Sequence, residues 1–127
     1  MYQQIHTVCT DDLDDLMHVN NIRYVEWVQN VAKAHWNDKA TQVMRETYYW
    51  VMLSHFIEYK SQAFLNDELT IKTYVESSNG ATSTRIVEII NNLENKLIAK
   101  SVTKWCLIDT KTKRPARITK EIAELFN

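Results

Sequence analysis

Turn-forming residues are scarce in this sequence, which has one glycine and one proline among its 127 residues. A fold of many short strands joined by tight turns needs both residue types in numbers. The scarcity therefore argues against such a fold and favours long strands, a long helix and few hairpins.

Cysteine is also rare: of the two present, Cys106 lies in an apolar run and is expected to pack in the core.

A strong charge bias and a long apolar run are both missing. The formal net charge is -1 at pH 7, so the chain has no bulk attraction for nucleic acid or for an anionic membrane. No apolar stretch approaches the roughly 20 residues that span a bilayer, and residues 1–6 lack the basic start and apolar run of a signal peptide. We therefore expect one cytoplasmic domain over residues 1–127, with no nucleic-acid and no membrane partner.

Apolar periodicity predicts one long helix. Asn20 and Asn21 offer side-chain oxygens that can cap its start, and behind them apolar residues recur three and four positions apart as far as His35 and Trp36. The apolar face is so wide that the helix needs cover over most of its circumference. Residues 41–48 extend this helical region or form a short second helix.

Strands are predicted in the sequence both before and after that helix. The stretch 50–59 is apolar on both faces, as in a strand that is buried on each side. Further strands are expected at 2–9, 69–75, 84–90 and 96–108, with turns at 64–68, 77–81 and 91–95 and a short terminal helix capped by Thr119. This order predicts an α+β domain in which a curved antiparallel sheet wraps around a long central helix, the hotdog arrangement. A second apolar face on the sheet implies association with other copies.

Carboxylates, a histidine and two asparagines crowd the entry to the helix, in residues 11–21. Hydrolysis of a thioester needs a carboxylate that activates water or attacks the carbonyl, and N–H donors, such as those of a helix N-terminus, that stabilise the developing oxyanion. Asp14, on a loop that leads into a helix, supplies the first and lies beside a source of the second. Asp14 can also simply cap a turn, and Asp11, Asp12 and Asp15 are interpreted as solvated loop charges. The spacing of the cluster matches no EF-hand, so we expect no metal site.

The helix entry also carries a recognisable motif. Asp14, His18, Val19, Asn20, Asn21 and Tyr24 have the spacing of a D-x-x-G-H-V-N-N-x-x-Y sequence. This resembles the 4-hydroxybenzoyl-CoA thioesterase branch of the hotdog enzymes, and it is similar to the D-x-N-x-H-V-N-N-x-x-Y stretch of acyl-acyl-carrier-protein thioesterases. The resemblance continues in residues 58–60, 63–68, 104–109 and 114–115, and so covers nearly the whole chain.

This resemblance implies roles for individual residues. Asp14 takes the position of the catalytic carboxylate, as general base or nucleophile, and His18 lies at the helix start that faces the thioester carbonyl. The implied substrate-binding residues are Met17, Asn20, Asn21, Tyr24 and Gln62. His18 can instead be a packing or capping residue, the two asparagines can be caps, and Tyr24 can be a packed helix residue.

The sequence departs from the family pattern at three positions. Met17 stands where the family usually has glycine, which makes the approach to the helix bulkier. Leu16 and Gln62 stand where the carrier-protein enzymes have a catalytic asparagine and glutamate, and these changes argue against the carrier-protein mechanism.

The resemblance predicts a thioester hydrolase that acts on acyl-CoA or an acyl-carrier-protein thioester. It implies a homo-oligomer, dimer or tetramer, with active sites between two protomers and no cofactor. Two alternatives remain: a non-catalytic acyl-thioester binding protein, and a hotdog dehydratase, to which the helix-entry motif is less similar.

Overall fold

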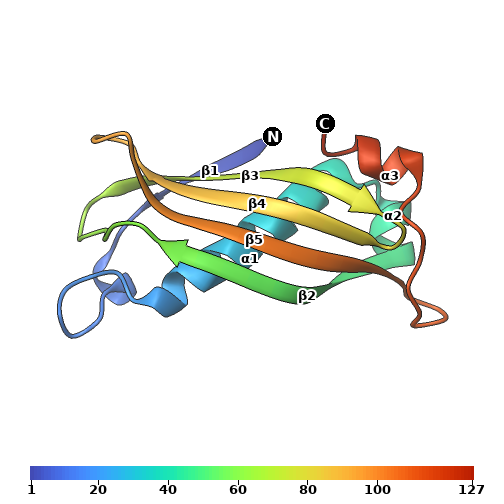
Figure 1. Cartoon of the computed structure of the whole chain (residues 1–127), viewed down its shortest axis with the longest axis horizontal. Helices are drawn as coiled ribbons and strands as arrows, with labels where there is room; N and C mark the ends of the chain where they lie inside the picture. Colours follow the sequence, from blue (N-terminus) through green and yellow to red (C-terminus); the bar gives the residue numbers. More distant parts are fainter.

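The long helix α1 (Asn21–Lys39) lies against one face of a five-stranded antiparallel sheet in the computed structural model, which describes all residues 1–127 (Figure 1). The strands are β1 (Tyr2–Thr7), β2 (Tyr48–Tyr59), β3 (Glu68–Asn79), β4 (Thr82–Asn91) and β5 (Lys96–Asp109). They lie in the order β1-β3-β4-β5-β2, so β1 and β2 form the two edges. The expected α+β arrangement of one helix against an antiparallel sheet is confirmed.

The helix boundaries follow from capping. The Asn20 side chain accepts a hydrogen bond from the backbone N–H of Ile22 at 3.0 Å, which satisfies a donor that has no partner inside the helix. Thr41 caps the short helix α2 (Gln42–Thr47), and Thr119 caps α3 (Lys120–Glu124) in the same way. None of these helices combines the length and the apolar content that crossing a bilayer requires.

Left-handed residues make the sharp turns. Asn66 and Asn95 have φ values of 70° and 50°, in two of the expected turns, and Gly80 has φ 64° between β3 and β4. That hairpin is tighter than predicted, because Asn79 pairs with Thr82 and only Gly80 and Ala81 lie outside the strands. The serines at 77 and 78, expected in the turn, instead continue β3.

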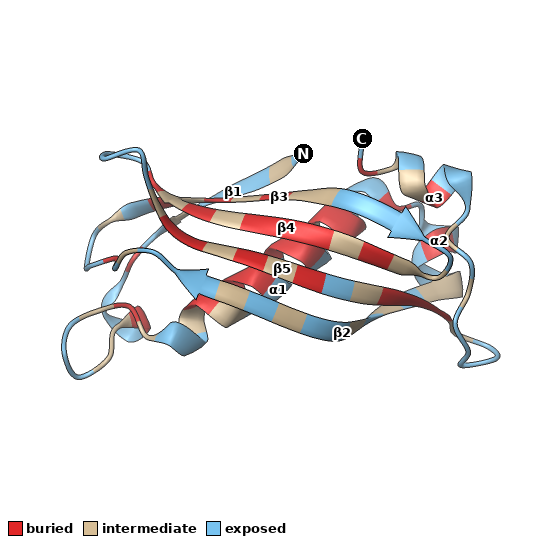
Figure 2. Cartoon of the chain, viewed as in Figure 1, coloured by how far each residue is buried: buried red, intermediate tan, exposed pale blue.

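The face of the sheet that packs against α1 carries two apolar clusters. One contains 13 buried residues from the first half of α1 and its surroundings, and the other contains 6 near the far end of the helix. Buried polar residues lie between them: His35 of α1, with Thr73, Arg85, Ser101 and Thr103 of the sheet. Figure 2 shows the buried residues concentrated on α1, β3, β4 and β5.

Strand β2 differs from the prediction. It lies at a sheet edge, and its side chains alternate between half-buried positions such as Trp50, which contacts Trp36 of the helix, and exposed ones. Val51, Leu53 and Phe56 are 41%, 54% and 62% exposed, so within one chain the strand is not buried on both faces (Figure 2). The second apolar face that the sequence showed is therefore open to solvent or to another chain.

A pair of identical substitutions tests this account of the core. Leu69 is fully buried in the larger cluster, whereas Leu93 is 95% exposed in the turn between β4 and β5. We expect Leu69→Ala to lower the free energy of unfolding by about 2–5 kcal/mol and Leu93→Ala to change it by less than about 0.5 kcal/mol, both measured by urea unfolding. Equal losses in the two variants would contradict the packing described here.

Candidate active site

The Asp14 loop, residues 13–19 between the 3₁₀ turn Thr10–Asp12 and α1, is held closed by its own backbone. Oδ1 of Asp14 accepts hydrogen bonds from the N–H groups of Leu16 at 2.9 Å and His18 at 3.1 Å. The N–H of Asp14 donates to the carbonyl of His18 at 2.8 Å. The carboxylate therefore has a fixed orientation, with Oδ1 occupied and Oδ2 without a hydrogen-bond partner in the chain.

Met17 makes the sharpest turn of this loop. Its φ is 64°, a left-handed conformation that costs a residue with a Cβ atom about 1–2 kcal/mol. The resembling enzymes have glycine at this position, which adopts the conformation without that cost. The loop thus keeps the turn although the glycine is replaced, and the Met17 side chain is 57% exposed.

The segment that follows β2 fixes the loop from the other side. The N–H of Val19 donates to the carbonyl of Ala63 at 3.1 Å, and the buried hydroxyl of Tyr24 accepts from the N–H of Ala63 at 3.2 Å. His18 forms a backbone bridge with Phe64, and their rings meet edge to face with centroids 5.5 Å apart. These contacts join the helix entry to Ala63 and Phe64, which are distant in the sequence.

The residues implied by the motif are brought to one end of the molecule. Asp14 and His18 are half-buried, Asn20 caps α1, and Asn21 and Gln62 are exposed. Tyr24 is only 2% exposed, and its hydroxyl is already engaged with Ala63. Tyr24 therefore positions the loop from the protein interior, as a packed helix residue.

The start of α1 offers one free amide. The N–H of Ile22 is used by the Asn20 side chain, and that of Arg23 donates to the Asn20 carbonyl at 2.9 Å. The N–H of Asn21 has no acceptor within the chain. It lies at the positive end of the helix dipole, where a negative oxygen is favoured.

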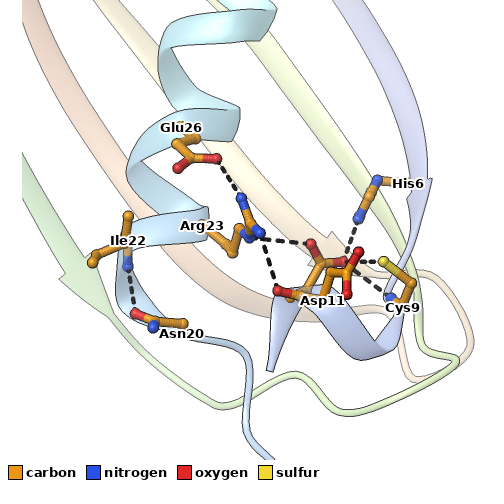
Figure 3. A network of polar contacts seen from close by, with 8 residues as sticks. His6, Cys9, Asp11, Asn20, Ile22, Arg23 and Glu26 are labelled. Carbon is orange, nitrogen blue, oxygen red and sulfur yellow. Dashed lines mark hydrogen bonds and ion pairs between the residues drawn. The ribbon is translucent and has the colours of Figure 1, made fainter. Parts of the chain in front are cut away.

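Asp12 does not match the prediction of a solvated loop charge. It is 5% exposed, and its Oδ2 lies 2.8 Å from Nε2 of His6 and accepts from the N–H of Cys9 at 3.0 Å. Its Oδ1 lies 3.5 Å from Nε of Arg23. Nη1 of Arg23 also pairs with Glu26 (Figure 3). Burial raises the pKa of Asp12, but the hydrogen bonds from Cys9 and His6 outweigh it and hold the pKa below its ordinary value.

This network, which we call the Asp12 clamp (His6, Cys9, Asp12 and Arg23), joins the end of β1 to the first turn of α1. The carbonyl of Asp12 also accepts from the N–H of Asn20 at 2.8 Å. The Asp14 loop is therefore anchored at both of its ends. No three His, Cys, Asp or Glu side chains lie together in a way that could hold a metal ion.

A cavity of about 420 Å³ lies further along α1, against β2, β4 and β5. We call it the Arg85 pocket; its walls include Trp36, Tyr48, Trp50, Arg85, Trp105 and Phe126. Among the α1 residues that line this pocket, Gln29 lies nearest to the start of the helix, and it is still about 12 Å along the helix axis from Asn21. The pocket is thus separate from the Asp14 loop of the same chain.

Comparisons with known proteins agree with this architecture. Residues 8–126 match the family model described as the thioesterase-like superfamily. The long-chain acyl-CoA thioesterase FadM of Escherichia coli (strain K12) is 27% identical over 117 residues, which cover 88% of this chain and 86% of the relative.

Solved structures are also similar. The probable thioesterase YbaW from Escherichia coli has a TM-score of 0.83 and 27% identity, covering 97% of this chain and 94% of that one. A Staphylococcus aureus protein in complex with CoA has a TM-score of 0.86 at 16% identity, covering 97% of this chain and 79% of that one, and shows the same fold. The family match, which extends over nearly the whole sequence, establishes that this chain belongs to the thioesterase-like superfamily and is a thioester hydrolase with the hotdog fold.

Proposed function

We propose that this protein is an acyl-CoA thioesterase in which Asp14 is the catalytic carboxylate and the N–H of Asn21 stabilises the oxyanion. The observation that carries the proposal is the fixed Asp14 carboxylate, whose Oδ2 is free beside the start of α1. The FadM relative is named as a long-chain acyl-CoA thioesterase, and the Staphylococcus aureus structure was solved with CoA. Both names favour CoA over a carrier protein.

The proposed chemistry follows from the two oxygens of Asp14. Oδ1 is occupied by the amides of Leu16 and His18, so Oδ2 is the atom that takes a proton from water or attacks the thioester carbonyl carbon. In the first case the water oxygen attacks the carbon; in the second, a mixed anhydride forms and water then hydrolyses it. The carbonyl oxygen becomes negative in both, and the thiolate of CoA leaves and takes up a proton.

The protein acts as a homodimer formed through β2. This strand is a long sheet edge with unpaired backbone groups and exposed apolar side chains at Val51, Leu53 and Phe56, a combination that favours pairing with another strand. Two copies of β2 that pair antiparallel about a two-fold axis satisfy both edges at once. The exposed apolar side chains of the two strands then become cross-strand neighbours on the same face of the joined sheet.

Such a dimer completes the active site. Tyr59, at the end of β2, packs on Tyr24 near the start of α1, whereas Trp50, near the beginning of β2, packs on Trp36 toward the end of α1. Antiparallel pairing places the Tyr59 end of one strand beside the Trp50 end of the other. The Asp14 loop of each protomer then adjoins the Arg85 pocket of its partner, and the acyl group lies in that pocket.

A matched pair of variants tests the role of Asp14. An asparagine at position 14 keeps an oxygen that can accept from Leu16 and His18, so Asp14→Asn retains the loop and removes only the base or nucleophile. We expect it to lower acyl-CoA hydrolysis by at least about 100-fold, measured as free-thiol release. Asp15→Asn, at the exposed neighbouring position, is the control and should keep wild-type rates.

The same assay separates the alternatives. Short, aryl and long-chain acyl-CoAs and acyl-carrier-protein thioesters are tested with the wild type, with circular dichroism and oligomer size as controls for folding. Full turnover by Asp14→Asn would refute the role of this carboxylate. Tight binding of acyl-CoA without thiol release by the wild type would instead identify a non-catalytic binding protein.

Charged residues introduced on β2 test whether the dimer forms through this strand. The double variant Leu53→Lys, Phe56→Lys is expected to shift the protein to monomers in sedimentation velocity and to reduce hydrolysis at least about tenfold, because like charges face each other across the two-fold axis and the site loses its second half. Ile5→Lys, on the opposite edge strand β1 and 56% exposed, is the control and should leave the dimer intact. A double variant that stays dimeric and active would rule out assembly through β2.

A further inference from the structure

Arg85 is a buried cation without a counter-ion. Its side chain comes from β4, on the face that packs against α1, and the residue is 5% exposed. None of the ion pairs in the chain includes it. Burial of an unpaired charge costs several kcal/mol, so most buried arginines face a carboxylate, and Arg85 does not.

The protein satisfies only part of the guanidinium. Nη1 donates to Nδ1 of His35 at 2.9 Å and to the hydroxyl of Thr73 at 3.0 Å, which uses both of its hydrogens. The hydrogens on Nε and Nη2 have no acceptor in the chain. The guanidinium is therefore held in place from one side and keeps donors free on the other, where Arg85 forms part of the pocket wall.

The groups in direct contact with Arg85 are neutral, and the pocket wall adds two further cations, Lys33 and Arg45, but no carboxylate. Burial lowers the pKa of Arg85 to about 10, so the side chain still carries its charge at neutral pH. Burial, together with the charge of Arg85, lowers the pKa of His35 to about 4, so the imidazole is uncharged and acts as a hydrogen-bond acceptor. The ring of Phe126 lies 5.0 Å from the guanidinium carbon and adds a cation–π contact without adding negative charge.

The rest of the pocket suits an apolar body with an acceptor group. Trp36, Tyr48, Trp50 and Trp105 give it aromatic walls, and its volume of about 420 Å³ is that of a small-molecule site. The indole N–H of Trp50 is buried and has no partner.

We propose that the Arg85 pocket binds a carboxylate carried on an aromatic or short aliphatic group, with Arg85 as the residue that recognises the anion. The carboxylate accepts from Nε and Nη2 of Arg85 in the bidentate arrangement that guanidinium favours, while the aromatic walls enclose the apolar part. This anion has two sources. It is either the far end of the acyl group of a thioester, a reading that rests on the proposed function, or a free carboxylic acid.

A binding experiment tests the site without any need for catalysis. Phenylacetate and phenylacetamide have the same shape, and only the first is an anion. We expect phenylacetate to bind the wild-type protein saturably and at least about tenfold more tightly than phenylacetamide, measured by calorimetry and by quenching of tryptophan fluorescence. Equal binding of the acid and the amide would overturn the proposal, and this comparison requires no variant to fold.

Variants of Arg85 test whether this residue is the source of the preference for phenylacetate over phenylacetamide. Arg85→Met removes the charge of this residue but keeps the length of the side chain, and it should remove most of the preference for the acid, because only Lys33 and Arg45 of the wall remain as cations. Arg85→Lys should retain more of the preference. Asp14→Asn, which removes the proposed catalytic carboxylate, should bind phenylacetate as the wild type does. Undiminished preference for the acid in Arg85→Met would also refute the proposal, whatever the outcome for Asp14.

Rates of acyl-CoA hydrolysis distinguish the two sources of the anion, the far end of an acyl group and a free carboxylic acid. Adipoyl-CoA and hexanoyl-CoA have the same chain length, but only adipoyl-CoA ends in a carboxylate. A ratio of kcat/KM that favours adipoyl-CoA, and that falls at least about tenfold in Arg85→Met, assigns the pocket to the far end of the acyl group. Binding of phenylacetate without such a preference assigns it to a free acid, and both results support the proposed anion site.

Discussion

The attachment of the Asp14 loop to the rest of the fold is the constraint on which the active site depends. The Asp12 clamp fixes one end of the loop to β1 and α1, and Ala63 fixes the other through hydrogen bonds with Val19 and Tyr24. The loop itself is too short to hold a carboxylate in place by packing. Its orientation comes instead from backbone N–H groups, whose positions are set by the sheet and the helix.

Much of the fold follows from the sequence because local rules determine it. Apolar periodicity and the Asn20 cap place α1, and the residues Asn66 and Gly80 mark turns because few other residues adopt their φ values at low cost. The position of β2 at a sheet edge could not be found in this way. A strand that is apolar on both faces has the same sequence whether its second face meets a layer of its own chain or another molecule.

The two charged residues that most shape the interior have different sequence signals. Asp12 stands among similar aspartates, and its burial depends on His6 and Arg23, which approach it only in the folded chain. Arg85, in contrast, precedes Val87 and Ile89 at spacings of two, so strand alternation places it on the same face as these core residues. A charged residue in register with a buried face is thus a signal that sequence inspection can use.

The cover over Arg85 comes from a short helix. Phe126 contacts Arg85, His35 and Trp36, and it is held there by α3, which has five residues. Helices of this length form and open readily, because little of their stability is intrinsic. Local opening of α3 therefore requires far less free energy than unfolding of the sheet. The wall of the Arg85 pocket thus combines a rigid side, formed by the sheet and α1, with a side of low local stability at Phe126.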